Sequence, residues 1–539
     1  MIEIAESFIQ RANGGEGAGL DGLCVAQRNN LRVWVERWNR RRAPVGYSLY
    51  SGRATMPSCD ILIRQANVLD GSGAGGELLD VALCGGRICA IGPALGHKAS
   101  TVVNAEGLAL APGFIDVHTH DDIAVISNPA MLAKLSQGVT TVIVGNCGIS
   151  AAPVDLGGRL PDPMNLLGDA SDFRYSSFAS YVGAIAEARP AVNVAALVGH
   201  TALRNNHMDR LDRAATDVEI ALMRTQLIES LENGALGLSS GLAYLSANGA
   251  TTEEITALAR PLAEAGAVYT THMRSESQTI LDAMHEAFEI GHLSKVPVII
   301  SHLKCAGIDN WGRSGEVLHA LDAARHRQQI GCDCYPYAAG SSTLDLRQVD
   351  ERVKITITWS MPHPESAGQL LKEIAEGWGI SQLEAARQLQ PAGAIYHSIS
   401  EDDMRRILAH PATMIGSDGL PNDPRPHPRL WGTFPRVLGR YTREERLLTL
   451  PEAVHKMTAM PAQRFNLAGR GLVREGYCAD LVLFDAAKIS DTATFSDPVS
   501  PAEGIAAVWV NGVLAYSSRR ATGERAGQFV ARGKTTWIQ

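Results

Sequence analysis

Eight short apolar runs, separated by longer stretches of helical period, are the feature that most limits how this chain can fold. The runs are Phe114–Val117, Thr140–Val144, Val192–Val198, Ala235–Leu238, Val268–Thr271, Val296–Ile300, Ile330–Cys334 and Thr413–Ile415. Between them lie amphipathic stretches such as Asp217–Glu232. Short buried strands that alternate with helices are typical of parallel βαβ units. Eight such units predict an α/β fold, a (β/α)8 barrel of the TIM type.

Segments on both sides of these runs have a different texture. Residues 56–112 and 466–539 contain short strands punctuated by Gly-Gly and Gly-Ser turns, and we expect both ends to form one small β-sandwich domain. The barrel then occupies residues 113–465. The surplus length after the seventh run predicts an insertion at about 338–411 that lies beside the barrel mouth.

Six metal-ligating side chains follow five of the eight runs. In this fold the chemistry lies at the carboxyl ends of the strands, so these side chains are expected to meet. They are His118, His120, Cys147, His272, His302 and Asp418. Imidazole, thiolate and carboxylate together favour zinc over magnesium or calcium. His200 also ends a run, but we do not expect it to be a ligand: it is either a hydrogen-bonding partner of the site or a histidine at the barrel mouth.

The charge balance and the cysteines indicate the class of protein. Lys plus Arg is 49 and Asp plus Glu is 57, which argues against a partner such as nucleic acid or an anionic membrane. Nine cysteines without a C-x-x-C pair predict a reduced, cytoplasmic chain rather than a disulfide framework. The first residues are acidic and no apolar region follows them, so we expect no signal peptide, and the apolar runs are too short to predict a membrane span.

Several stretches give the chain a resemblance to a known family. They are GFIDVHTHDD, GVTTVIVGNCGIS, GALGLSSGLAY, THMRSE, DCYPYAAGSS and GSDGLPNDPRPHPRLWGTFPRVLG. On these motifs the chain resembles the N-acyl-D-amino-acid deacylases (D-aminoacylases) of the amidohydrolase superfamily, over roughly residues 58–535. Many members of the superfamily carry a modified lysine on strand four. Here strand four ends in Ser239 and Ser240, and Cys147 takes the place of that lysine.

The resemblance implies a metal arrangement and a reaction. One zinc ion would bind tightly to Cys147, His272 and His302, and a possible weaker site would use His118, His120 and Asp418, with Cys147 able to bridge both. The reaction is hydrolysis of a small-molecule N-acyl-D-amino acid to a carboxylate and a free D-amino acid. Zinc-bound water can ionise near neutral pH, and Asp418 is the expected general base and acid.

The remaining site residues also follow from the resemblance. Tyr244 is the candidate donor to the tetrahedral oxyanion, and Arg429 is placed to hold the substrate α-carboxylate through two hydrogen bonds. Lys304 and Ser341 match family positions that line the same pocket. Arg347 either meets an acidic substrate side chain or points to solvent, and the sequence leaves both open.

Two other functions are compatible with the barrel. A cyclic-amide hydrolase of the dihydropyrimidinase or hydantoinase type would share the fold and the metal, but the missing strand-four lysine counts against it. A catalytically inactive metal-binding scaffold would be expected to have lost a ligand, whereas every expected position is filled. The preferred side chain, the number of metal ions and the oligomeric state stay open.

Residues 1–55 stand apart from both predicted domains. They contain eight Arg and five acidic residues, a net charge of +3. Because the whole chain has a net charge of −8, residues 56–539 carry a net charge of about −11. We interpret this segment as a disordered N-terminal extension, or as the product of an upstream start codon with Met56 as the natural first residue. Mass analysis of the native N-terminus distinguishes the two.

Overall fold

The computed structural model describes residues 57–156 and 160–533, so the predicted N-terminal extension lies outside the described residues. Each predicted apolar run overlaps a barrel strand. The strands are β6 (Phe114–Asp116), β7 (Val139–Val144), β8 (Asn193–Ala196) continued by β9 (Val198–Gly199), β10 (Gly237–Gly241), β11 (Val268–His272), β12 (Val298–Ile300), β13 (Ile330–Cys334) and β17 (Thr413–Ile415). Neighbouring strands pair in parallel, as βαβ units require.

The strands form two hydrogen-bonded arcs. One has the order β6-β7-β8, and the other has the order β17-β13-β12-β11-β10-β9. The chain itself joins the arcs at Leu197, between β8 and β9, where the Leu197 amide donates to Val144 O at 2.9 Å. On the other side, a single bridge between Thr119 and Gly419 brings β6 beside β17. The barrel therefore closes between its first and last strands with little backbone pairing.

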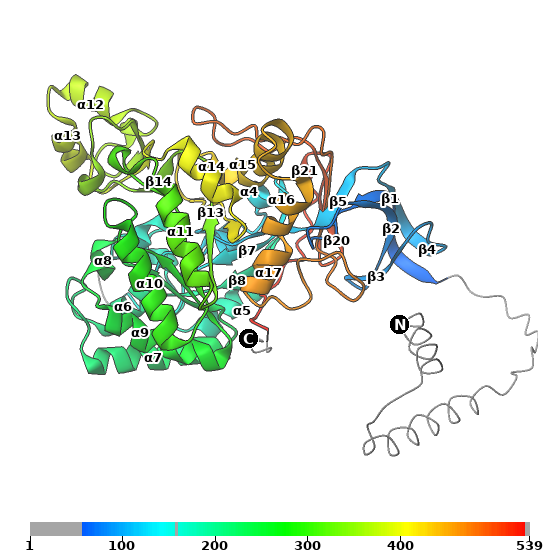
Figure 1. Ribbon diagram of the computed structural model, residues 1–539, viewed down its shortest axis with the longest axis horizontal. Coiled ribbons are helices and arrows are strands. Elements are labelled where there is room, and N and C mark those ends of the chain that lie inside the picture. Colours follow the sequence, from blue (N-terminus) through cyan, green and yellow to red (C-terminus); the bar gives the residue numbers. More distant parts are fainter. Residues whose placement is uncertain (1–56, 157–159, 534–539) are drawn as a thin grey trace, which may run out of the picture. The chain divides into compact units, whose positions relative to one another are not determined.

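Helices surround the strands, and successive ones pack side by side (Figure 1). The longer ones are α5 (Phe178–Ala188), α6 (His200–His207), α7 (Asp217–Glu232), α9 (Thr252–Ala265), α10 (Ile280–Ser294), α11 (Ser314–Arg325), α14 (Glu401–Ala409), α15 (Arg429–Arg436) and α16 (Leu450–Met457). The short ones are α3 (Ala124–Ser127), α4 (Leu132–Leu135), α8 (Leu245–Asn248) and α17 (Ala459–Arg464). Side chains cap the amino-terminal ends of two of these helices: Thr216 and Glu219 form a capping box at α7, and Thr251 caps α9.

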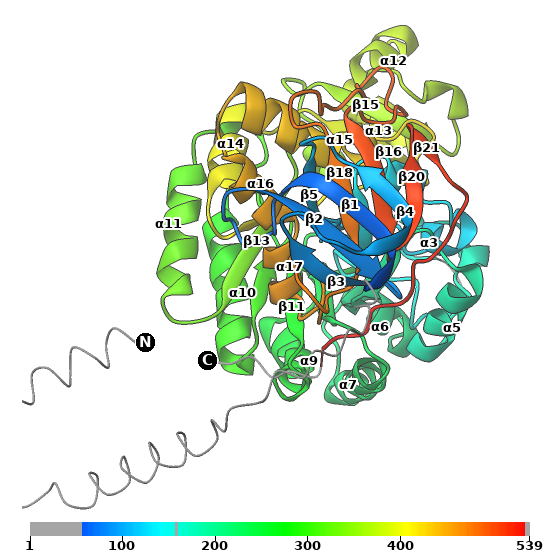
Figure 2. The ribbon, with the colours of Figure 1, turned by 90° about the vertical axis from the view of Figure 1, so that its right-hand side faces the viewer.

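The two ends of the described chain share one nine-stranded sheet (Figure 2). Its members are β1 (Ser58–Val68), β2 (Glu77–Cys84), β3 (Arg87–Gly92), β4 (Lys98–Asn104), β5 (Ala109–Pro112), β18 (Leu481–Phe484), β19 (Ile505–Val510), β20 (Val513–Ser517) and β21 (Arg520–Ala521). The antiparallel pair β5 and β18 joins the two halves. Neighbouring residues of β1, Leu62 and Ile63, belong to different apolar clusters, so both faces of the sheet are covered.

The last described residues leave this sheet and return to the barrel. Val194 forms a parallel bridge with Phe529, in which the Val530 amide donates to Val194 O at 2.7 Å. Val530 packs with the apolar side chains that fill the barrel interior, among them Ile115 and Ile143. Arg532 donates to Ala265 O at 2.7 Å. The tail thus lies at the amino-terminal end of the barrel, opposite the strand ends that carry the predicted site.

A small subdomain follows the seventh barrel strand. It consists of the antiparallel strands β14 (Gly340–Thr343), β15 (Ile355–Ser360) and β16 (Ala392–Tyr396), with α12 (Leu371–Trp378) and α13 (Gln382–Leu389). These elements bury a cluster of their own. Helix α14 falls within the predicted insertion but packs against α11 and β17 of the barrel.

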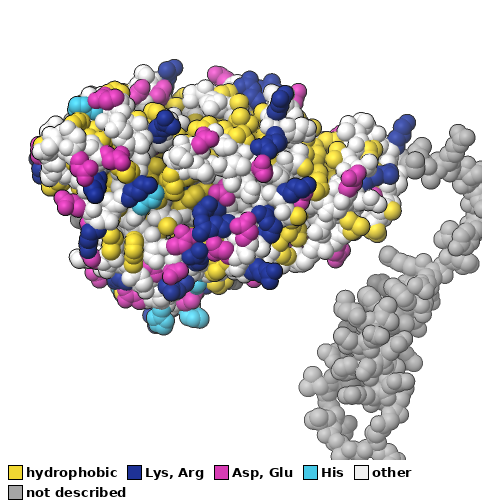
Figure 3. Space-filling model, turned by 90° about the horizontal axis from the view of Figure 1, so that it is seen from above, with side chains coloured by type: hydrophobic (Ala, Val, Ile, Leu, Met, Phe, Trp, Pro, Cys, Tyr) yellow, Lys and Arg dark blue, Asp and Glu magenta, His cyan; other side chains and the backbone are white. Residues whose placement is uncertain are grey.

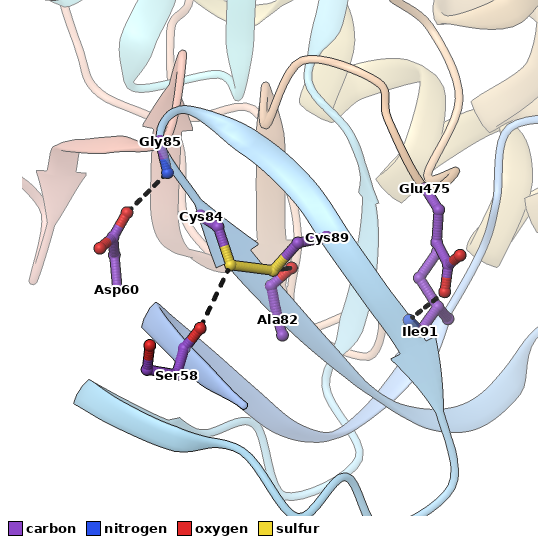
Figure 4. The surroundings of a disulfide bond; sticks show 8 residues. All are labelled: Ser58, Asp60, Ala82, Cys84, Gly85, Cys89, Ile91 and Glu475. Carbon is purple, nitrogen blue, oxygen red and sulfur yellow. Dashed lines mark hydrogen bonds between the residues drawn. A yellow bond between two sulfur atoms is a disulfide. The ribbon is translucent and has the colours of Figure 1, made fainter. Parts of the chain in front are cut away.

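One pair of cysteines is oxidised, so the prediction of a fully reduced chain is wrong there. Cys84 and Cys89 form a disulfide across the hairpin of β2 and β3 (Figure 4). The Gly85-Gly86 turn between them brings the strands together, and Asp60 accepts a hydrogen bond from the Gly85 amide at 2.7 Å. The other six described cysteines are free. Cys332 and Cys334 are buried in β13, as expected for barrel packing.

The surface carries both signs of charge. On the face drawn in Figure 3, cationic and acidic side chains are intermixed, with apolar side chains between them. Among the described residues, no helix is both long and apolar enough to cross a membrane.

Candidate metal centre and active site

The six predicted ligands meet at one end of the barrel. His118 and His120 follow β6, Cys147 follows β7, His272 ends β11, His302 follows β12 and Asp418 follows β17. Their donor atoms form two groups, each with all atoms within 4.8 Å of one another. The first group is Cys147, His272 and His302, and the second is His118, His120, Cys147 and Asp418. Cys147 belongs to both.

The separations between donor atoms suit a metal ion. Cys147 Sγ lies 3.1 Å from His118 Nε2 and 3.3 Å from His302 Nε2. Asp418 Oδ1 lies 3.2 Å from His120 Nε2. Ligands at zinc distances and tetrahedral angles stand about 3.3–3.6 Å apart. The Nδ1 atom of His272 is buried and has no hydrogen-bond partner among the described residues. Donor chemistry, spacing and this unpaired nitrogen all fit a metal centre.

Three of the six ligands have a strained backbone. Cys147, His302 and Asp418 adopt positive φ angles of 54°, 36° and 49°. Side chains other than glycine rarely occupy this region, and such residues persist only where the surrounding structure enforces them. The sharp turns aim three donor groups from separate strands at one point.

Ser239, in strand β10, supports the turn that carries Cys147. Its hydroxyl donates to Gly145 O at 2.5 Å and accepts from the Gly148 amide at 3.0 Å. Gly148 has φ +76°, and a Cβ there would stand 2.6 Å from Gly241 N. The end of strand four therefore positions the thiol of strand two and contributes no ligand of its own.

The electrostatics favour an ionised thiol in the metal-free protein. Burial alone would raise the pKa of Cys147, but the neighbouring His118 and His302 outweigh burial and hold the pKa well below its usual range. Burial likewise opposes ionisation of Asp418, and Arg429 and His118 outweigh it, so the pKa of this carboxyl is also well below its usual range. A thiolate and a carboxylate are the forms that bind a metal ion.

Two acidic residues that sequence reasoning missed orient the histidines. Asp333, in β13, lies 3.2 Å from His118 Nδ1 and accepts a hydrogen bond from the His302 amide at 2.8 Å. Glu276 lies 2.9 Å from His302 Nδ1 and 3.7 Å from His272 Nε2. Carboxylates on the far nitrogen of a ligating histidine fix its ring and its tautomer.

Arg429 lies beside the metal ligands, and its guanidinium forms an ion pair with Asp418, the predicted general base. Its Nη1 is 2.8 Å from Asp418 Oδ2, and its Nη2 donates to Ser341 O at 3.0 Å. The side chain is 1% exposed, and its Nε has no hydrogen-bond partner among the described residues. Ser341 takes part through its carbonyl, while its hydroxyl donates to Ala394 O at 3.4 Å.

Tyr244 and Lys304 flank the first donor group. The Tyr244 ring lies 4.8 Å from the His272 ring. Lys304 Nζ donates to Glu276 at 2.6 Å and lies over the ring of Tyr335. Tyr335 was not predicted: its ring is sandwiched between Lys304 and Arg429, and its hydroxyl is buried without a partner among the described residues. Its signal in the sequence is its position, immediately after the seventh strand.

The structure also shows the contacts of Arg347 and His200, which the sequence did not assign to the site. Arg347 donates to both carboxylate oxygens of Asp345 and to Ala243 O, with half of its side chain exposed. His200 lies outside both donor groups, and its Nε2 is 2.9 Å from Glu254 Oε1, which also pairs with Arg204. This position agrees with the expectation that His200 is not a ligand, and the contact with Glu254 favours the hydrogen-bonding alternative.

Comparison with known proteins places these residues in a family. A model described as "Amidohydrolase family" matches residues 101–516. The chain belongs to the amidohydrolase family. It is 48% identical to a D-aminoacylase of Alcaligenes xylosoxydans xylosoxydans, over 88% of this chain and 98% of the relative. In the same organism, an N-acyl-D-aspartate deacylase is 47% identical over 89% and 97%, and an N-acyl-D-glutamate deacylase is 45% identical over 85% and 93%.

Solved structures of this branch of the amidohydrolase family share the fold. A D-aminoacylase described by its binuclear metal centre has a TM-score of 0.86 and 46% identity, covering 88% of this chain and 100% of that one. An N-acyl-D-glutamate deacylase of Bordetella bronchiseptica, complexed with zinc and a phosphonate inhibitor, has a TM-score of 0.85 and 44% identity with the same coverage. The predictions of family, barrel fold and amidohydrolase activity are confirmed, and a metal site is supported.

Proposed function

We propose that this amidohydrolase cleaves the amide bond of N-acyl-D-amino acids, releasing a carboxylate and a free D-amino acid, with zinc as its metal. The observation that carries the proposal is the thiol of Cys147, shared by two donor groups beside the buried guanidinium of Arg429. Relatives at 45–48% identity are named for N-acyl-D-amino-acid substrates, which supports the same class of small-molecule substrate here.

The two donor groups suggest how the metal is held. Cys147, His272 and His302 would hold one ion tightly, because the set includes a low-pKa thiol and a histidine braced by Glu276. His118, His120 and Asp418 would hold a weaker second ion, with Cys147 as the bridge. A bound zinc ion supplies a nucleophile at neutral pH and polarises the acyl carbonyl.

The protein's own residues then manage protons and orientation. Asp418 Oδ accepts the proton of the attacking water and returns it to the leaving amine. Arg429 Nε, buried and unpaired among the described residues, is a donor for the substrate α-carboxylate, which would share the guanidinium with Asp418. Tyr244 and Lys304 donate from beside His272 and His302, and Tyr244 serves the oxyanion of the tetrahedral intermediate.

The structure bears on whether the substrate side chain is acidic or neutral through Arg347. Arg347 is the cation near the mouth that would meet an acidic side chain, but its guanidinium is already held by Asp345. A substrate carboxylate would have to compete with that ion pair. Only turnover of acidic and neutral substrates in parallel resolves this preference.

Neither alternative function has a specific observation in its favour. A D-hydantoinase shares the fold at a TM-score of 0.56 and 17% identity, which carries no argument about the substrate. An inactive scaffold is opposed by the intact set of six ligands with their bracing carboxylates. We also retain the cytoplasm as the proposed compartment, because six of the eight described cysteines are free.

The test is hydrolysis of paired N-acetyl-D- and N-acetyl-L-amino acids with leucine, glutamate and aspartate side chains. The protein should first be stripped of metal and then reloaded with zinc, and bound metal should be counted by elemental analysis. We expect turnover of the D series alone, restored by zinc. Equal rates on the two enantiomers, or full activity without metal, would contradict the proposal. Turnover of a hydantoin instead of the linear amides would favour the cyclic-amide alternative.

A further inference from the structure

The junction between β6 and β17 carries all three ligands that belong only to the second donor group. Within the described residues these two strands share one backbone bridge, between Thr119 and Gly419. The Asp418 amide also donates to His118 O at 2.6 Å, and the His120 amide donates to Gly419 O at 3.0 Å. So few backbone bonds leave the relative position of His118, His120 and Asp418 dependent on side chains.

A fully buried lysine lies at this junction. Lys134, on the short helix α4, is 0% exposed. Its Nζ donates to Asp116 Oδ2 at 2.8 Å, to Thr119 Oγ1 at 2.8 Å and to Ser417 Oγ at 3.0 Å, and it lies 3.0 Å from Asp121 Oδ2. An ammonium group has three protons to donate, and here all of them meet residues next to metal ligands.

The partners of Lys134 are tied to one another across the two strands. Asp116, at the end of β6, accepts hydrogen bonds from the Ser417 amide at 2.8 Å and from the Ser417 hydroxyl at 2.6 Å. The Thr119 hydroxyl donates to Asp121 at 2.6 Å. Thr119 stands between His118 and His120, and Ser417 precedes Asp418. The network therefore grips the chain immediately beside each of the three ligands.

We propose that Lys134 is a positioning residue for the second metal group, and that it sets how tightly His118, His120 and Asp418 bind an ion. The inference rests on the metal arrangement of the proposed function. The lysine binds the carboxylates of Asp116 and Asp121 and takes the place of the missing strand pairing. Without its charge, two buried carboxylates face each other unscreened and the junction relaxes.

The effect should be confined to one of the two metal groups. His272 and His302 lie at the ends of β11 and β12, which pair with neither β6 nor β17, and Glu276 and Asp333 brace them. Cys147 is held by the turn that Ser239 supports. None of these groups contacts Lys134. Loss of the lysine should therefore weaken the second ion and spare the first.

The variants are Lys134→Met and, as a milder change, Ser417→Ala, which removes the hydroxyl that links Lys134 to Asp116. The matched control is Lys456→Met. Lys456 is also a buried lysine that anchors β17, but it binds His410 O and Thr413 O at the opposite end of that strand. Zinc binding to each metal-free protein is measured by titration against a chromophoric chelator, together with kcat, KM and thermal unfolding of the metal-free forms.

We expect the second dissociation constant to rise by about 10- to 100-fold in Lys134→Met, the usual range for residues that support metal ligands, and by about tenfold in Ser417→Ala. The first constant should change by less than about threefold, and kcat should fall while KM holds. Lys456→Met should change unfolding alone. A general loss of structure would instead weaken both sites together.

The remaining outcomes of these titrations contradict either the role of Lys134 or the proposed metal arrangement. If wild-type protein binds two ions and both test variants keep an unchanged second constant, the inference is refuted and the proposed function stands. If Lys134→Met does not fold, Ser417→Ala decides by the same criterion. If wild-type protein binds only one ion, the two-group arrangement fails and this inference fails with it.

Discussion

Replacing Arg429 with methionine separates two roles that the structure gives to one side chain. The guanidinium pairs with Asp418 at 2.8 Å, and its unpaired Nε is available to a substrate carboxylate. Methionine keeps most of the apolar stem and removes every hydrogen-bond donor. Loss of the pair with Asp418 affects all substrates alike. Loss of the carboxylate contact affects only substrates that carry a carboxylate.

The two losses differ in size and in the substrates they reach. Removing one partner of a buried ion pair typically costs about 3–5 kcal/mol, and here that cost falls on Asp418 whatever the substrate. A hydrogen bond to a charged group contributes about 1.5–3 kcal/mol. At about 1.4 kcal/mol for each factor of ten, the carboxylate contact accounts for roughly 10- to 150-fold in kcat/KM.

The assay is a cycle of two enzymes and two substrates. Wild-type and Arg429→Met proteins are each given an N-acetyl-D-amino acid and its α-carboxamide, and kcat/KM is measured for all four pairs. If Arg429 binds the carboxylate, the variant should discriminate between the two substrates roughly 10- to 150-fold less than wild type does. The control is Arg436→Met, at the other end of α15, where the guanidinium pairs with Asp491 at 2.8 Å. It should leave the discrimination unchanged.

Additive effects would refute the carboxylate role. In that case Arg429→Met would slow both substrates by the same factor, and the guanidinium would act only as the partner of Asp418. An unchanged kcat/KM for the acid would refute both roles together.

Three further changes test the rest of the site. Asp418→Asn should keep the first zinc ion and lower kcat by about 10²- to 10⁴-fold, measured by steady-state kinetics with metal analysis, and a near-normal kcat would remove Asp418 as the base. Cys147→Ala should lose both ions because the thiol is shared, whereas Cys305→Ala, a buried free cysteine elsewhere, should keep them, as elemental analysis would show. Burial opposes ionisation of Glu254, but the hydrogen bond with His200 and the charge of Arg204 outweigh it and lower the pKa of Glu254 to about 2. The ionised carboxylate therefore stabilises the fold fully above about pH 4.5, and this stabilisation disappears as the pH falls towards 2. Glu254→Gln should therefore flatten the acid limb of denaturant unfolding of the metal-free protein, and the exposed Glu232→Gln should not.

The ligands could be predicted from the sequence because each stands at a fixed place in a repeated pattern. A parallel barrel brings strand ends together whatever lies between them, so His118 and Asp418 meet although 300 residues separate them. Asp333 and Glu276 gave no comparable signal. Asp333 is one polar residue inside an apolar strand, and its bond to His118 spans 215 positions that only the register of the sheet relates.

Two other features were hidden for different reasons. Lys134 lies in a stretch with no periodic pattern, and its burial depends on carboxylates contributed by neighbouring turns. The disulfide did have a signal. The Gly85-Gly86 turn predicts a hairpin, and a hairpin brings Cys84 close to Cys89. The prediction of a reduced chain depended instead on the absence of a C-x-x-C pair, which is no measure of this local pairing.

The shared sheet and the returning tail constrain how the chain can fold while it is being synthesised. Strand β5 pairs with β18, so residues 109–112 wait for residues 481–484, about 370 positions later on the ribosome. At about 5–20 residues per second, that delay is roughly 20–70 s. Val194 waits almost as long for Val530. During that time β5 is an uncovered apolar edge, the kind of surface that recruits other nascent chains. Emergence of β18 and the tail, rather than emergence of the barrel, therefore completes the fold, and its yield in cells should depend on chaperones that hold the first strands apart until then.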